Sequence, residues 1–390
     1  MISDNHIILM LDNSRAADRG MIRGIMDYAH LRGNWHFYRY SPRFRVAPFT
    51  PGGQDDILER LHRLEADGII GYLPDEAKLI QLIQHRGFPA VTIPVRKPIQ
   101  GLVSIQQDES VGIVGARHLL ERGYRHFAYC GMKDYWSTVR QQGFCDELER
   151  HGCGAHIYPL ARERKRRELE LNRMARWIVE LDKPVAIMAC NDERSADLVE
   201  ACRLADCAIP DLVALLGVDN DEMICRLTSP QLSSVKLNFE KVGYEAARAL
   251  DHQIGNKERL GDEIRFVSTG VVTRQSTNIL AFEDAEVASA LQFIRNNARR
   301  NIRVQDVVDH SLLSLRALQQ RFRGSLGRSI HQEIRRVRID LFAQMLVNTD
   351  LTVYQIAGEL ELEDTHHIAR LFKREMGLTP VEYRKLNRNP

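Results

Sequence analysis

The C-terminal part of the chain contains one pattern twice, and this duplication constrains the fold more than any other feature. The two copies are residues 304–322 and 353–374. Each copy predicts a short helix, a tight turn and a second helix, which Ser314 opens in the first copy and Asp364 in the second, because both residues are good N-caps. A helix-turn-helix places its second helix in the major groove of DNA. One chain is therefore expected to read two adjacent grooves of double-stranded DNA, about 10–10.5 base pairs apart.

Side chains on one face of each second helix are the candidates to contact DNA. Arginine suits guanine and glutamine suits adenine in the major groove, so Arg316, Gln319 and Gln320 are the predicted base readers of the first copy. The full predicted DNA-binding set is Ser314, Arg316, Gln319, Gln320, Arg321, Thr365, His366, His367, Arg370 and Lys373. The residues expected on the core side are Leu315, Leu318, Phe322, Leu362, Ile368 and Phe372. Adjacent histidines point to different helix faces, so His366 and His367 predict contact with DNA and no metal site.

The segment between the two copies predicts a spacer helix. Apolar residues recur at helical spacing over 330–346. Arg335, Arg336 and Arg338 lie off that apolar stripe, and we expect them on a solvated basic face. The helix would hold the two helix-turn-helix units at a fixed separation.

The C-terminal residues 287–390 resemble the DNA-binding domain of AraC-type transcription regulators. The most specific part of the resemblance is Ile356-Ala357 through Arg370-x-Phe372-Lys373-Arg374, followed by Gly377-Leu378-Thr379-Pro380 and Val381-Glu382-Tyr383-Arg384. The family usually has Gly-Phe where this chain has Glu361-Leu362, and an aromatic residue at Ile368. Glycine tolerates positive φ at little cost and glutamate does not, so the second turn is expected to be built differently or to be strained.

Charge agrees with a DNA-binding C-terminus. Residues 287–390 carry 17 lysines and arginines against 11 aspartates and glutamates, while the rest of the chain has 37 against 41. Binding to phosphates needs a local basic surplus of this kind. Another basic segment, residues 162–170, mixes both signs at helical spacing, and we interpret it as a solvated helix face in preference to a DNA contact.

Length and composition limit the remaining possibilities. A chain of 390 residues predicts two or three domains. The N-terminus lacks the features of a secretory signal, no apolar run is long enough to span a membrane, and the seven cysteines are scattered without a CxxC pair or zinc spacing. We expect a cytoplasmic protein with reduced thiols, no cofactor and no membrane partner.

Residues 1–275 alternate short apolar runs with amphipathic helices. The predicted strands are 6–11, 68–73, 89–94, 126–131, 185–190 and 212–218. Alternating units of this kind predict parallel sheets covered by helices on both faces. Ligands of such sheets bind beyond the carboxyl ends of the strands.

Polar side chains follow several of these strands. The candidates are Asn13, Ser14, Arg140, Asn191, Asp192, Asp219 and Asn220. Carboxylates and amides can grip pairs of hydroxyls, and a guanidinium can grip oxygens, so the set suits a polyol. Each residue alone is more simply a loop or capping residue, and Asp192 and Asp219 could cap the helices that follow them. Their recurrence at equivalent strand ends favours a binding site.

Residues 6–277 resemble the sugar-binding domain of LacI/GalR-type repressors, which shares its fold with periplasmic binding proteins. The matching pieces include Asp67-Gly68-Ile69-Ile70, Arg140-x-x-Gly143-Phe144, Cys190-Asn191-Asp192 and Leu216-Gly217-Val218-Asp219-Asn220, in family order. The resemblance implies effector-binding roles for Arg140, Asn191, Asp192, Asp219 and Asn220, and extends to Asn13 and Ser14. LacI-type proteins carry their helix-turn-helix before this domain. In this chain the predicted DNA-binding domain, which we call the reader, follows it.

Together the two resemblances imply a two-lobed α/β sensor (1–277), a short acidic linker (278–286) and an all-α double helix-turn-helix domain (287–390). The implied function is a sugar-responsive, sequence-specific transcription regulator, an activator that acts as a homodimer with RNA polymerase and responds to a pentose such as xylose. A repressor with the same parts, or an effector other than a pentose, remains the alternative. A doubly wound enzyme is disfavoured, because the chain has no GxGxxG after a strand, no P-loop and no GxSxG elbow.

Overall fold

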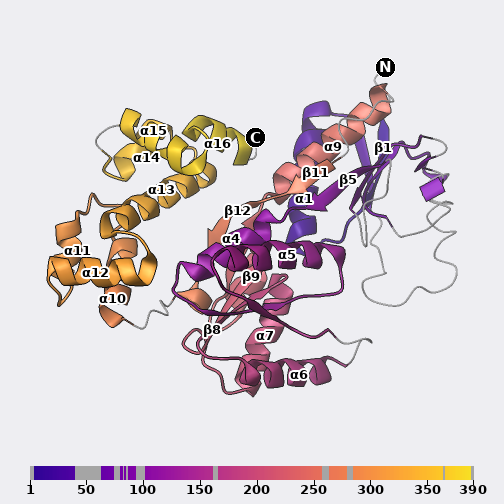
Figure 1. Ribbon diagram of the computed structural model, residues 1–390. Helices are drawn as coiled ribbons and strands as arrows, with labels where there is room; N and C mark the ends of the chain where they lie inside the picture. The colour runs from indigo at the N-terminus through magenta and orange to yellow at the C-terminus, as the bar shows by residue number, and fades with distance from the viewer. Residues whose placement is uncertain are drawn as a thin grey trace.

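The chain folds into a two-lobed α/β domain followed by a helical domain (Figure 1). The computed structural model describes residues 4–39, 63–73, 80–81, 83–84, 87–93, 102–160, 166–256, 263–278, 284–362 and 365–387. None of the helices in these ranges is both long enough and apolar enough to cross a membrane.

The first lobe is built on a parallel sheet of order β11-β5-β4-β3-β1-β2. Its strands are β1 (Asn5–Met10), β2 (Trp35–Arg39), β3 (Gly68–Tyr72), β4 (Ala90–Ile93), β5 (Val103–Gln107) and β11 (Glu263–Phe266). Helices α1 (Ala16–Arg32) and α9 (Phe239–Asn256) pack together against the sheet (Figure 1). They cross at Gly24, where a Cβ atom would lie 1.8 Å from the Glu240 carbonyl oxygen, so only glycine allows this approach.

The second lobe is built on a sheet of order β12-β10-β9-β8-β6-β7. Its strands are β6 (His126–Cys130), β7 (Ala155–Ile157), β8 (Val185–Ala189), β9 (Val213–Val218), β10 (Ser233–Leu237) and β12 (Ser268–Val272), and only the β10–β12 pairing is antiparallel. The helices of this lobe are α4 (Ser110–Leu120), α5 (Tyr135–Arg150), α6 (Arg167–Glu180), α7 (Asp192–Leu204) and α8 (Glu222–Leu227), and the short 3₁₀ helix η2 (Gln275–Thr277) follows β12. Strands β8 and β9 are buried along their whole length, as expected of central parallel strands covered on both faces.

The chain passes between the lobes three times, after β5, after β10 and after β11. The side chain of Asn238 joins two of these crossings. Its Oδ1 accepts a hydrogen bond from the Val267 amide at 2.8 Å, and its Nδ2 donates to the Arg265 carbonyl oxygen at 3.3 Å. The crossings after β10 and after β11 therefore lie side by side between the two lobes.

The helical domain contains two helix-turn-helix units that share one long helix. Its elements are α10 (Ala285–Asn296), α11 (Val304–His310), α12 (Leu315–Leu326), α13 (Ile330–Asn348), α14 (Val353–Glu359), α15 (Thr365–Met376) and α16 (Pro380–Asn387). Ser329 and Gln332 form a capping box at the start of α13. Ile330 and Ile334 on the first half of α13 belong to the core of the first unit, and Ile339 and Phe342 on the second half belong to a separate core in the second unit.

The predicted fold class is confirmed, and the six predicted strands match β1, β3, β4, β6, β8 and β9 within one or two residues at each end. Residues 279–283 of the predicted linker lie outside the described residues. Of the basic segment, residues 162–165 also lie outside them, and the exposed Arg167 pairs with Asp197 and Glu200 on α7, which agrees with a solvated helix face.

Two predictions about the helical domain were wrong. Leu315 is not on the core side, because 42% of it is exposed, whereas Leu318 and Phe322 are fully buried as predicted. Arg336 and Arg338 are not on a solvated face. Arg338 is buried and donates to backbone carbonyl oxygens, and Arg336 pairs with three carboxylates. Helical periodicity separates apolar from polar positions, and it does not reveal where a polar position meets a neighbouring element.

Candidate functional site

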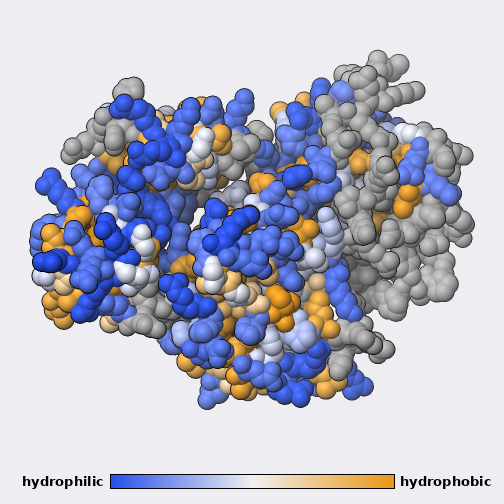
Figure 2. All heavy atoms as spheres, viewed as in Figure 1, coloured by the Kyte–Doolittle hydropathy of each residue, from blue (hydrophilic) through white to orange (hydrophobic). Residues whose placement is uncertain are grey.

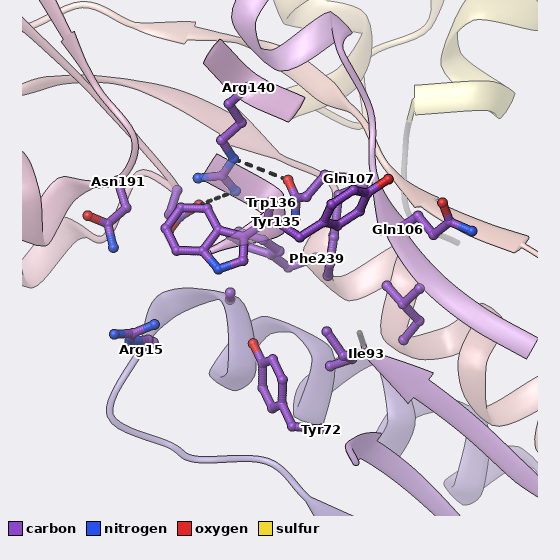
Figure 3. Close-up of a pocket in the computed structure, with 14 residues that line it drawn as sticks. Arg15, Tyr72, Ile93, Gln106, Gln107, Tyr135, Trp136, Arg140, Asn191 and Phe239 are labelled. Carbon is purple, nitrogen blue, oxygen red and sulfur yellow. Dashed lines mark hydrogen bonds and ion pairs between the residues drawn. The ribbon is translucent and has the colours of Figure 1, made fainter. Parts of the chain in front are cut away.

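A cleft between the two lobes is the candidate effector site. The residues that line it are Arg15, Ala17, Tyr72, Ile93, Ile105, Gln106, Gln107, Tyr135, Trp136, Arg140, Asn191, Asp219, Phe239 and Phe266. Tyr72 and Ile93 point from the first lobe toward Trp136 and Arg140 of the second (Figure 3). Aromatic rings and a few polar groups around one cleft are typical of a small-molecule site.

Arg140 lies at the centre of the polar groups in the cleft. It projects from α5, is 3% exposed, and its guanidinium stacks on the Trp136 ring at 4.9 Å from the ring centroid. Its Nε donates to Gln107 Oε1 at 3.1 Å and its Nη2 to Asp219 Oδ1 at 3.1 Å (Figure 3). Its Nη1 donates to the Cys190 carbonyl oxygen at 2.5 Å. These three bonds use one hydrogen from each nitrogen, and a guanidinium carries five, so Arg140 retains donor capacity for a ligand.

Asp219 reaches the cleft from a strained turn after β9. Asp219 has φ of 102° and Asn220 has φ of 50°, both in the left-handed region that non-glycine residues rarely occupy. The turn is held because the Asn220 amide donates to Ser234 Oγ and Arg274 donates to Asn220 Oδ1. Backbone strain maintained in this way is concentrated at functional sites. Burial raises the pKa of Asp219, and the neighbouring Arg140 opposes that effect.

Asp192 does not line the cleft, which corrects its predicted role as a sugar ligand. Asp192 is 1% exposed. Its Oδ1 accepts from Ser234 Oγ at 2.6 Å and its Oδ2 accepts from the Asp221 amide at 2.7 Å. Both oxygens therefore support the turn that carries Asp219, and Asp192 acts behind the site. Burial, followed by the nearby Asp219 carboxylate, raises the pKa of Asp192 to about 8.

The raised pKa of Asp192 predicts a pH-dependent stability. Below its unfolded-state pKa the carboxyl is protonated in both states, and between that value and about 8 the folded protein holds a proton that the unfolded chain releases. The free energy of unfolding should therefore fall as pH rises from about 4 to about 8, by at most about 1.4 kcal/mol for each pH unit from this group.

Asp192→Asn should flatten this fall, and melting curves of wild type and variant between pH 5 and pH 8 measure the difference. Asp182→Asn, at an exposed aspartate of the same lobe, is the control and should follow the wild type. Parallel pH profiles for Asp192→Asn and wild type would contradict the prediction.

The alternative capping roles of Asp192 and Asp219 are also corrected. Asn191 caps α7, where its side chain accepts from the Arg194 amide, and Asp221 caps α8, where its side chain accepts from the Met223 amide. Asn191 also lines the cleft, so one residue starts the helix and faces the ligand space.

The remaining predicted effector residues are divided between the cleft and its surroundings. Arg140, Asn191 and Asp219 come together in the lining, whereas Asn13, Ser14 and Asn220 are not part of it. Asn13 and Ser14 are both exposed in the loop before α1, where the next residue, Arg15, lines the cleft instead. Sequence reasoning missed the aromatic residues. Trp136, four positions before Arg140 and therefore one helical turn away, was the available signal.

Ion pairs between the lobes lie beside the cleft. Arg15 of the first lobe pairs with Glu193 of the second at 3.1 Å, and Arg19 pairs with Asp221 at 2.7 Å. Asp221 is only 5% exposed, so the Arg19 pair is the better shielded of the two. These contacts hold the lobes together around the cleft.

The first recognition helix presents polar side chains to solvent. Arg316, Gln319 and Gln320 are exposed on α12, and Ser314 caps it by accepting from the Ala317 amide. Arg321 also lies on α12 and pairs with Asp284 at 3.4 Å. Figure 2 shows hydrophilic side chains over much of the visible face of the helical domain, at the left of the view.

The second recognition helix is described in part. Arg370 and Lys373 are exposed on α15, while Ile368 and Phe372 are buried as predicted. Leu362, which was also predicted to be buried, is only half-buried and packs against the edge of that core. The side chains of Thr365, His366 and His367, and the predicted N-cap Asp364, lie outside the described residues. Within the described ranges, no three histidine, cysteine, aspartate or glutamate residues are grouped so that they could hold a metal ion.

The end of α4 connects the two-lobed domain to the helical domain. Glu121 Oε1 accepts from Arg336 Nη1 of α13 at 2.6 Å, and the Glu121 carbonyl oxygen accepts from Arg295 of α10 at 3.1 Å. The next residue, Arg122, is buried and donates from Nε to the carbonyl oxygen of Thr277, just before the interdomain segment. The same helix end therefore holds both the start of the linker and the shared helix of the reader.

Comparison with known families finds one match in the two-lobed domain and one in the helical domain. The periplasmic binding protein-like domain family matches residues 116–277, and the helix-turn-helix domain family matches residues 308–386. The order of these two matches, sensor before reader, is the order predicted from the two resemblances.

Several known proteins match the chain along its length. A xylose operon regulatory protein of Haemophilus influenzae is 25% identical over 97% of both chains, and that of Escherichia coli K12 is 24% identical over 99% of both chains. The solved structure of a xylose-binding transcription activator matches the whole of both chains with a TM-score of 0.59 at 23% identity. A LacI family transcriptional regulator from Enterococcus faecium, solved with bound ribose, matches 72% of this chain with a TM-score of 0.58.

Proposed function

We infer that this chain is a DNA-binding transcription regulator in which a sugar-binding sensor, the two-lobed domain, controls a double helix-turn-helix reader. We propose that its effector is a pentose, and that D-xylose is the pentose it binds best. The observation that carries the choice of pentose is the full-length similarity to xylose operon regulatory proteins, in which sensor and reader occur together in the same order. A regulator of this kind would act in the cytoplasm, where it reaches the chromosome.

The chemistry of the cleft supports a sugar. Arg140, Asp219 and Asn191 provide a cation, an anion and an amide that can bind neighbouring hydroxyls. Trp136 and Tyr72 provide aromatic faces on which the C–H groups of a sugar ring can pack. Pockets of one fold change their ligand through a few side chains, so the sugar itself must be measured. Melting curves with pentoses and hexoses test the proposal, and D-xylose should raise the melting temperature most.

The contacts around α4 supply a route from sugar to DNA. At Gly112 of α4 a Cβ atom would lie 2.1 Å from the Arg140 carbonyl oxygen, so the start of α4 lies directly against the turn of α5 that carries Arg140. The other end of α4 carries Glu121, which contacts Arg336 of the reader. Closure of the lobes on a sugar would therefore move one end of α4 and change the contact at the other. A ligand shifts such an equilibrium only through its different affinities for the two states.

We propose activation as the output, with the chain acting as a homodimer that recruits RNA polymerase. The full-length structural relative is described as a transcription activator, which supports this sign. Repression by the same parts is the alternative. Transcription from a promoter that contains the selected site, with and without D-xylose, separates the two outputs.

Arg316→Ala should weaken binding to the specific DNA site by about 1–3 kcal/mol and relax the preference at one base pair. Arg316 lies exposed near the N-terminus of α12, where a recognition helix contacts base edges. Arg323→Ala, at an exposed residue in the last turn of the same helix, is the control and should affect specific and random DNA equally. Equal losses for Arg316→Ala would make Arg316 a phosphate contact.

A further inference from the structure

The turn of the second helix-turn-helix unit contains a residue that its conformation does not favour. Glu361 has φ of 49°, in the left-handed region where glycine is tolerated and glutamate is strained. The turn itself closes through backbone bonds, from the Glu361 amide to the Gly358 carbonyl oxygen and from the Leu362 amide to the Ala357 carbonyl oxygen. Glycine could make the same backbone bonds, so the turn alone does not explain the glutamate.

The side chain of Glu361 contacts the other helix-turn-helix unit. Its Oε2 accepts a hydrogen bond from the Asn301 amide at 2.9 Å. Asn301 lies between α10 and α11, directly before Ile302, which belongs to the core of the first unit. The bond therefore joins the turn of the second unit to the backbone of the first, across 60 residues of sequence.

Arg338 completes the connection from the shared helix α13. It is 8% exposed, and its Nη1 donates to Asn301 Oδ1 at 3.0 Å. Its Nη2 donates to the carbonyl oxygens of Leu360 and Glu361. One buried guanidinium thus holds the first unit through Asn301 and the second unit through the two carbonyl groups of its turn.

The need for such a connection follows from the cores. The two units have separate hydrophobic cores, and each takes its α13 residues from a different half of that helix. A groove between the units is lined by residues of both, including Ile302, Leu362, Arg338 and Glu361. If α13 were the only connection, the two units could rotate relative to each other whenever that helix bends. Hydrogen bonds across the groove prevent this rotation.

We propose that Asn301, Arg338 and Glu361 form a clamp, a set of hydrogen bonds that fixes the position of recognition helix α12 relative to recognition helix α15. Glu361 is then a positioning residue, because it helps to determine which distance between the two bound DNA segments the protein prefers. This inference rests on the proposed reading of DNA by both units. Two linked binding modules gain affinity only when their geometry lets both engage at once, so a looser clamp should reduce the preference for one spacing.

The test compares full-length wild type with Glu361→Gly on DNA selected from a random pool by the wild type. Three duplexes are needed, namely the selected site, the site with two base pairs inserted between its segments, and the site with one segment scrambled. Wild type should prefer the selected site over the spaced one by about tenfold or more, and Glu361→Gly should reduce that preference to about threefold or less. Affinity for the one-segment duplex should agree within about twofold between the two proteins.

Two further variants separate positioning from folding. Glu361→Gln keeps the length of the side chain and an oxygen that can accept from the Asn301 amide, so it should retain most of the spacing preference. Glu359→Gln removes the same charge from an exposed position two residues away and should retain all of it. The melting temperature of Glu361→Gly should not fall, since glycine accepts positive φ without strain.

The possible outcomes separate a failure of the clamp proposal from a failure of the proposal that both units read DNA. A wild-type protein with no spacing preference would overturn reading by both units, and the clamp with it. A preference that Glu361→Gly retains in full would overturn the clamp alone. An equal loss of affinity on the one-segment duplex would place the effect of Glu361 inside the second unit and would also overturn the clamp.

Discussion

Arg140→Ala will reduce sugar affinity by about 3–4 kcal/mol, or roughly 10²–10³-fold. The variant removes the cation that faces the cleft and leaves the Asp219 carboxylate without its partner. It also removes donors to Gln107 and to the Cys190 carbonyl oxygen, so the site loses its arrangement as well as a ligand. Isothermal titration with the sugar that gives the largest thermal shift measures the loss.

Arg194→Ala is the matched control for this experiment. Arg194 is 6% exposed, lies in the same lobe, pairs with Glu170 at 3.0 Å and stacks over the Tyr158 ring at 5.2 Å, as Arg140 does with Asp219 and Trp136. It does not line the cleft. Arg194→Ala should therefore lower the melting temperature and leave sugar affinity within about twofold of wild type, since only the buried pair is lost. Equal losses of affinity in both variants would show that Arg140 acts through folding.

Arg336→Ala should destabilise the helical domain by about 2 kcal/mol, because the buried Glu333 then keeps only its pair with Arg328, and Asp340 loses its cation. Arg336 pairs with Glu333, which is fully buried, with Asp340 at 2.8 Å, and with Glu121 of the sensor at 2.6 Å. Urea unfolding followed by circular dichroism measures the loss, and a change under 1 kcal/mol would contradict it.

Glu121→Gln separates the contact between domains from the stability of the reader. Glu121 is partly exposed and lies on the sensor, so its neutralisation leaves the bonds among Arg336, Glu333 and Asp340 in place. The helical domain should keep its stability, while the effect of sugar on DNA affinity should shrink. An unchanged sugar effect would show that the signal does not pass through this pair.

Much of the fold could be predicted from the sequence because its central strands are buried on both faces. The segments of β8 and β9 are continuous apolar runs between helices, and such runs identify parallel strands. The edge strands β2, β7, β11 and β12 and the internal strands β5 and β10 were not predicted. Strand β2 contains half-buried and exposed residues without regular alternation, and β7 has only three residues, so neither has a pattern that stands out from a loop.

The site could be predicted only in part. A residue that directly follows a parallel strand is expected near the ligand, but the sequence does not show in which direction its side chain points. Asn191 and Asp192 are adjacent after β8, yet Asn191 faces the cleft and Asp192 points behind it toward Ser234. Trp136 and Tyr72 were missed because aromatic residues are also the ordinary filling of a core. The departure at Glu361 was noticed from sequence, while its contact with Asn301 depends on how two separate units pack.

Fluorescence anisotropy of labelled DNA tests whether a sugar in the cleft controls DNA binding by the C-terminal units. The DNA is the site selected from a random pool by the full-length chain, and its affinity is measured with and without saturating D-xylose at one fixed salt concentration, since such affinities depend strongly on salt. D-xylose should change the affinity by about fivefold or more, the range usual for coupled sites, and Arg140→Ala should remove this change. Binding curves that superimpose with and without D-xylose, and with every other pentose that raises the melting temperature, would contradict it.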